Sequence, residues 1–128
     1  MKRIVALTSA GVLLASGLTL ATAASANAVT CYGGAASYTK KANKYIQPPD
    51  LRGYYVTTNR CSDINIKTNS AVDVKVCMRT GHMTYACPDR YTRTTAGQWK
   101  VIAYDMKDGF AFNLYFKNSA EHTGKLAF

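Results

Sequence analysis

Residues that could carry out acid–base chemistry are few and scattered in this 128-residue chain. Beyond residue 28 there is one glutamate, Glu121, and there are two histidines, His82 and His122. Hydrolysis usually needs two carboxylates, or a nucleophile with a base and an orienting group. Glu121 and His122 are adjacent in a polar segment, and no spacing links them to an arginine as a small ribonuclease would require. We therefore expect both to be solvated loop residues in a protein that is not an enzyme.

The sequence also predicts no metal or cofactor site. Asp63 and Asn65 flank Ile64, but calcium needs several more oxygen ligands in a compact loop. We expect Asp63 to pair with an arginine at a strand end, either Arg60 or Arg79. The chain has no glycine-rich phosphate loop and no nucleophile elbow.

Tyrosine is the one unusual abundance, with nine copies, all beyond residue 28. A hairpin over residues 98–117 would bring Lys100, Tyr104 and Tyr115 together on its outer face. Aromatic rings beside positive charge stack against sugars, and also against bases. These three residues are therefore a candidate ligand platform. The alternative is that the loop from Tyr38 to Tyr54 packs over this face and covers it.

Two alternating runs predict that hairpin. Apolar residues recur at every second position, at Trp99, Val101 and Ala103 and again at Phe110, Phe112, Leu114 and Phe116, on either side of a turn signal at Asp108-Gly109. A period of two is typical of half-buried strands. The pairing would set Trp99 opposite Phe116, Val101 opposite Leu114 and Ala103 opposite Phe112.

Further strand signals recur about every ten residues, with turn residues between them. They lie at Tyr54–Thr58, Ser62–Thr68, Val72–Met78, Tyr85–Thr94 and Gly124–Phe128. The segment from Ala36 to Tyr45 suits a strand or a short helix, and the Pro48-Pro49 exit favours the strand. We predict an all-β fold, an antiparallel, jelly-roll-like β-sandwich of about seven or eight short strands.

Residues 1–28 are expected to be an export signal. Lys2 and Arg3 precede an uncharged, mostly apolar run from Ile4 to Ala26, and Ala26-Asn27-Ala28 fits signal peptidase. A membrane anchor is the alternative, but its interspersed Ser, Thr and Gly and the Ala-x-Ala ending weigh against it. Residues 29–128 would then form a single secreted domain without a membrane span. It would carry fourteen basic and seven acidic residues, a net charge of +7.

The four cysteines, Cys31, Cys61, Cys77 and Cys87, predict two disulfides. Zinc sites usually need cysteines two to four residues apart, and the gaps here are 30, 16 and 10 positions. A hairpin turning on Gly81-His82-Met83 sets Cys77 opposite Cys87. Cys31 then pairs with Cys61 by elimination. The two bridges would contribute about 3 and about 4 kcal/mol to stability.

From residue 31 to residue 128 the chain resembles a set of small secreted proteins of streptomycetes and related actinobacteria that have no established activity. The likeness lies in Cys31–Ala35, Tyr38–Lys40, Thr57–Asn69, Val74–Cys77, Ala96–Val101 and Lys107–Gly109. The resemblance implies export and a disulfide-bearing β domain, and it assigns no catalytic or binding residue. Met83 and Phe110–Phe112 depart from the pattern of the set.

The positive charge, the tyrosines and the lack of catalytic residues favour a binding function. We expect an exported monomer, secreted or retained on the cell wall, that binds an anionic or glycan component such as a cell-wall polymer or polysaccharide. Nucleic acid is the less favoured partner. The alternative is a small secreted inhibitor or antibacterial protein that presents the hairpin closed by Cys77 and Cys87.

Overall fold

A computed structural model describes residues 31–49 and 51–128, and the predicted export signal, residues 1–28, lies outside them. The all-β prediction is confirmed. A helical turn at residues 31–33 precedes ten strands. Their bounds are β1 Ala36–Lys40, β2 Ile46–Gln47, β3 Tyr55–Val56, β4 Ile64–Thr68, β5 Asp73–Gly81, β6 Thr84–Ala86, β7 Thr92–Arg93, β8 Trp99–Ala103, β9 Ala111–Phe116 and β10 His122–Ala127.

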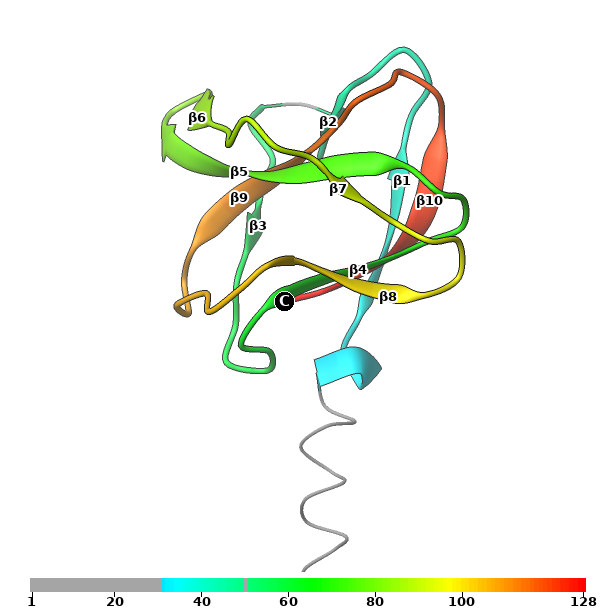
Figure 1. Ribbon diagram of the computed structural model, residues 1–128. Helices are drawn as coiled ribbons and strands as arrows, with labels where there is room; N and C mark the ends of the chain where they lie inside the picture. Colours follow the sequence, from blue (N-terminus) through cyan, green and yellow to red (C-terminus); the bar gives the residue numbers. More distant parts are fainter. Residues whose placement is uncertain (1–30, 50) are drawn as a thin grey trace, which may run out of the picture.

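The strands form two antiparallel sheets packed face to face (Figure 1). One, sheet A, has the order β1-β10-β4-β8. The other, sheet B, has the order β2-β9-β5-β6, with β3 also paired to β9 and β7 also paired to β5. β2 and β3 lie along the same edge of β9, and β6 and β7 lie along the same edge of β5. If each of these pairs is counted as one interrupted strand, the two sheets have four strand positions each. This is the strand order of a jelly roll, as predicted, but the strands number ten where about seven or eight were expected, because two of the eight positions are each divided into two short strands.

The inward faces of both sheets build one core. Phe112, Leu114 and Phe116 of β9 are completely buried, as the alternation predicted. The remaining buried core residues are Tyr38, Ile64, Ile66, Val72, Val74 and Leu126. Burying one large apolar side chain is worth about 1.5–3 kcal/mol. This shared core therefore holds the two sheets together.

The predicted hairpin between β8 and β9 is wrong. β8 pairs with β4 in sheet A, and β9 pairs with β5 in sheet B, so the connection crosses from one sheet to the other. Alternation identifies which face of a strand is buried but not which strand lies beside it. Trp99 is also not in the core cluster: its ring packs against Tyr32 at a centroid distance of 4.6 Å.

Both predicted disulfides are present. Cys31 bonds to Cys61, and Cys77 bonds to Cys87 across the β5–β6 hairpin. The hairpin turns at His82 and Met83, so the expected geometry of this bridge is confirmed. The two bonds fit an oxidising, extracellular type of environment.

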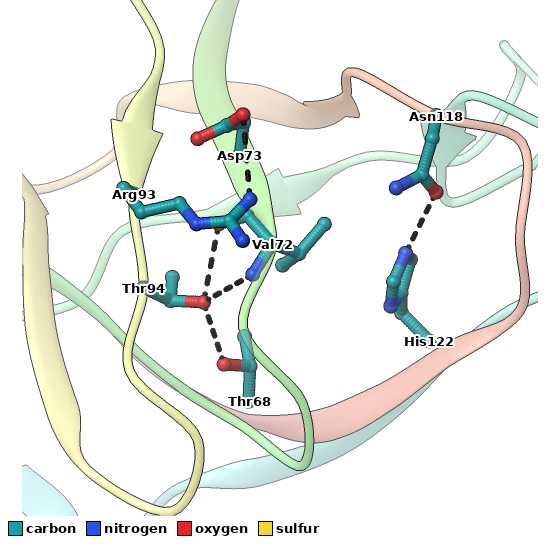
Figure 2. Close-up of polar contacts among 7 residues, drawn as sticks. All are labelled: Thr68, Val72, Asp73, Arg93, Thr94, Asn118 and His122. Atoms are coloured by element: carbon teal, nitrogen blue, oxygen red, sulfur yellow. Dashed lines mark hydrogen bonds and ion pairs between the residues drawn. The ribbon is translucent and has the colours of Figure 1, made fainter.

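Hydrogen bonds close the ends of the sandwich. The Thr94 hydroxyl receives hydrogen bonds from the Thr68 hydroxyl at 2.7 Å and from the Val72 amide at 3.0 Å, so it links β4 to the start of β5 (Figure 2). The predicted pairing of Asp63 with an arginine is wrong. Its carboxylate accepts the backbone N–H of Asp105 at 2.8 Å and thereby fixes the turn after β8.

Candidate ligand-binding face

The structure divides the predicted platform between the two sheets. Lys100 lies on β8 in sheet A, and Tyr115 lies on β9 in sheet B. Tyr104 follows β8 in a turn and is 70 % exposed. Because β8 and β9 are not neighbours, the strand pairing that was to unite the three side chains does not exist.

Tyr115 instead belongs to a row of side chains across the outer face of sheet B. Its ring stacks on Tyr45 at a centroid distance of 6.0 Å with an interplanar angle of 16°. Lys75 lies directly opposite Tyr115 in the β5–β9 register, with Nζ 5.6 Å from the Tyr115 centroid and 4.5 Å from that of Tyr91. Lys117 Nζ lies 5.7 Å from the Tyr91 centroid. We call these five residues the tyrosine face.

The tyrosine face presents neutral phenols beside ammonium groups. Burial raises the pKa of Tyr115, and three nearby phenols raise it further, those of Tyr85, Tyr91 and Tyr45. The Tyr115 hydroxyl therefore stays protonated at neutral pH and can donate a hydrogen bond. Tyr45 is 46 % exposed, so its ring is open to a ligand. Such a surface can stack against a sugar ring and attract an anionic group on it.

The alternative prediction was that the loop from Tyr38 to Tyr54 covers the face that carries Tyr115. The end of this loop, residues 51–54, covers one half of the outer face of sheet B. Arg79 donates to the carbonyl oxygen of Leu51 and lies 5.1 Å from the Tyr54 ring centroid. The buried Asn113 donates to the carbonyl oxygen of Gly53 at 3.0 Å. Residues 51–54 thus pack over the Asn113 side of the sheet, while the row that contains Tyr45 and Tyr115 keeps an exposed ring.

An open groove of about 540 Å³ lies beside this covering loop. Its lining includes two lysines, Lys41 and Lys44, and three apolar residues, Pro49, Leu51 and Met83. Lys44, which lines the groove, is the sequence neighbour of Tyr45 in the tyrosine face. The groove itself combines positive charge with apolar contact.

The prediction that Glu121 and His122 are solvated is confirmed for Glu121 and wrong for His122. The His122 ring is 8 % exposed, stacks on Phe116 and contacts the Asn118 side-chain oxygen at 2.8 Å (Figure 2). Burial lowers the pKa of His122, and the charge of Lys40 lowers it further. The alternation of His122, Gly124 and Leu126 along β10 would have revealed its inward position.

Lys40 is completely buried beneath the loops that follow β1 and β9. Its ammonium group donates to the carbonyl oxygens of Lys44 at 2.8 Å, of Asn118 at 3.2 Å and of Ala120. Three acceptors use all three N–H groups of an ammonium ion. Lys40 thereby fixes the segment that carries Lys44 and Tyr45, so it positions one edge of the tyrosine face.

Ser70, His122 and Asn118 have the residue types of a hydrolytic triad. The Ser70 hydroxyl lies 3.4 Å from His122 Nδ1, which is longer than the roughly 2.6–3.2 Å typical of a nucleophile and its base. The His122 ring is also held against Phe116 at a centroid distance of 5.6 Å. The contacts support a structural role for His122 in anchoring the loop before β10.

Within residues 31–49 and 51–128, no cluster of three or more His, Cys, Asp or Glu side chains is placed to hold a metal ion. Over the same residues, no helix has the length and apolar character needed to cross a membrane. Comparison with protein-family models, with curated proteins and with solved structures finds no match to this chain.

Proposed function

We propose that this protein is an exported, non-enzymatic binding domain that holds an anionic glycan of the cell envelope on its tyrosine face. The observation that carries this proposal is the alternation of rings and charges across sheet B. Tyr45, Tyr115, Lys75 and Tyr91 follow one another in that order. A sugar ring would stack on the exposed Tyr45 ring, and its carboxylate or phosphate would lie near Lys75 and Lys117.

The charge balance supports an anionic ligand. Fourteen basic residues face seven acidic ones beyond residue 28, and the ion pair found among the described residues joins Arg93 to Asp73 at 3.5 Å. Lys75 and Lys117 contact aromatic rings instead of carboxylates. An incoming anion would therefore find them unneutralised. The groove lined by Lys41 and Lys44 adds further positive charge.

Co-sedimentation with purified cell walls and with insoluble anionic polysaccharides tests this proposal. We expect retention at low ionic strength that is lost in high salt, because exposed charges are screened within about 3 Å at 1 M salt. Removing one stacking ring with Tyr45→Ala is expected to weaken retention roughly 5- to 150-fold, since ring stacking is worth about 1–3 kcal/mol. Tyr104→Ala is the matched control, since Tyr104 is exposed and lies outside the tyrosine face. Absence of retention at low salt would refute the proposal.

A second candidate, a secreted inhibitor or antibacterial protein, is supported by the β5–β6 hairpin. Its tip residue Met83 is 40 % exposed and has φ = 59°, and the Cys77–Cys87 bond braces the hairpin stem. A hairpin whose backbone is braced by a disulfide and whose tip exposes an apolar side chain suits contact with a target, since little ordering of the backbone is needed on binding. Growth-inhibition and protease-inhibition assays of the variant His82→Ser/Met83→Ser discriminate this candidate: unchanged potency would exclude the hairpin.

A further inference from the structure

The outer face of sheet A also combines lysines with aromatic rings. In register across its four strands lie Ser37 of β1, Lys125 of β10, Lys67 of β4 and Trp99 of β8. Their chain neighbours Tyr38, Leu126 and Ile66 are buried, so this row points outward. The Tyr32 ring packs against Trp99 with an interplanar angle of 35°, and Tyr32 is 45 % exposed. We call these five residues the tryptophan face.

Two lysines occupy the centre of this face with no opposing charge. Lys67 and Lys125 are direct cross-strand partners, at a position where Cβ atoms lie about 4.5–5.5 Å apart and like charges destabilise the pair. In the described part of the chain neither forms an ion pair with a carboxylate. An anion placed between the two ammonium groups would relieve this repulsion.

The neighbours of the lysine pair suit a sugar. On one side is the Tyr32–Trp99 pair, whose exposed Tyr32 ring can stack against a pyranose. On the other side is the exposed hydroxyl of Ser37, which can hydrogen-bond to sugar hydroxyls. Because neighbouring strands lie about 4.8 Å apart, a segment of a few sugar units, with a carboxylate or phosphate over the lysines, would span this row.

We propose that the tryptophan face is a second binding site for an anionic glycan, so that the domain bridges two polymer chains. The identity of the ligand as an anionic glycan depends on the proposed function, whereas the location of the second site is inferred from the residues of sheet A. The two faces lie on opposite surfaces of a sandwich whose sheets pack about 10 Å apart. A short stretch of polymer cannot contact both faces, so bivalent binding joins separate chains or separate segments of one chain.

Trp99 is the single tryptophan of the chain, so its fluorescence reports on this face alone. We would titrate the protein with a glycosylated polyol-phosphate polymer and, separately, with a polyuronate, and record Trp99 emission and turbidity. The two polymers distinguish phosphate from carboxylate as the recognised anion. We expect a saturable, salt-sensitive change in emission with at least one of them, accompanied by turbidity that falls when protein is in excess.

Variants of the two faces separate the two sites. Lys67→Ser/Lys125→Ser should weaken the emission response about tenfold and abolish turbidity, since each exposed charge contributes a factor of roughly 2 to 5. Tyr45→Ala should leave the emission response unchanged and still abolish turbidity. Lys100→Ser is the matched control, because Lys100 is exposed beside Trp99 but lies outside the row. The double variant removes the repulsion but also the lysine stems, so it should unfold within a few degrees of the parent.

Each outcome decides one site. Suppose that binding of the protein to cell walls depends on Tyr45 but that Trp99 emission changes with neither polymer. This result would overturn the second site and remain consistent with the proposed function. A Trp99 response that the lysine variant weakens, without any effect of Tyr45→Ala on turbidity, would support the second site and remove the first. Tighter binding of single-stranded nucleic acid than of both polymers would overturn the ligand class.

Discussion

Replacing Lys40 by methionine tests how the loops beside the tyrosine face are held. Methionine keeps an apolar stem of similar length and removes the ammonium group, which donates to three carbonyl oxygens. Those oxygens belong to Lys44, Asn118 and Ala120, which are exposed residues. Water can therefore form some of the hydrogen bonds that the Lys40 ammonium group no longer donates. At about 1 kcal/mol for each lost bond, we expect Lys40→Met to lower the free energy of unfolding by about 2–4 kcal/mol.

Urea denaturation and thermal unfolding measure this loss directly. For a domain of this size about 1 kcal/mol shifts the melting temperature by roughly 4–8 °C, so we expect a decrease of roughly 10–30 °C. Lys41→Met is the matched control: Lys41 is exposed on the same loop, and its replacement should change stability by less than about 0.5 kcal/mol.

A second readout separates the charge from the packing. The positive charge of Lys40 lowers the pKa of His122, so in Lys40→Met the His122 pKa measured by NMR should rise toward its ordinary value. If Lys40→Met is as stable as the parent and leaves the His122 pKa unchanged, then the ammonium group does not hold these loops. Such a result would refute the reasoning, since buried cations can be replaced by apolar groups without loss when their partners are weak.

Four further predictions follow from the packing. Tyr38→Phe should raise the free energy of unfolding by about 1 kcal/mol in urea denaturation, because the buried Tyr38 hydroxyl has no hydrogen-bond partner among the described residues. Gly124→Ala should lower it by about 1–3 kcal/mol in the same assay, because a Cβ there would overlap the carbonyl oxygen of Lys67. Lys125→Glu should raise it by about 0.2–1 kcal/mol, because an ion pair with Lys67 replaces a repulsion. Burial and the charge of Lys40 lower the pKa of His122 in the folded state. The contribution of neutral His122 to the free energy of unfolding should therefore be complete above about pH 6.5 and be lost as the pH falls through the folded-state pKa. Urea denaturation of His122→Gln at the same pH values should not show this loss.

Local patterns predicted the strands and the disulfides well. The two-residue period of Phe112, Leu114 and Phe116 identified the buried face of β9, and the turn at His82 and Met83 placed Cys77 opposite Cys87. These features depend on residues that are close in sequence. Strand pairing depends on the whole topology, which explains why the β8–β9 hairpin was predicted wrongly.

The tyrosine face could not be predicted because its members come from distant segments. Tyr45, Lys75, Tyr91 and Tyr115 meet only after β2, β5 and β9 join one sheet. Of the predicted platform residues Lys100, Tyr104 and Tyr115, only Tyr115 belongs to the tyrosine face, and its role in binding a ligand stays a prediction. Buried polar residues were missed for a different reason. A lysine is rarely buried, so the inward position of Lys40 required tertiary contacts to recognise, whereas the inward position of His122 was indicated by the alternation along β10 and was overlooked.

The central claim, that sheet B binds an anionic glycan through its tyrosine face, is tested most directly by calorimetry against one soluble anionic envelope polymer. Two variants that fold equally well are compared at low salt: Tyr45→Ala/Lys75→Met alters the tyrosine face, and Tyr104→Ala/Lys100→Ser alters exposed residues outside it. We predict that the first loses binding at least about tenfold and that the second binds like the parent. Equal affinities of the two variants would contradict the account.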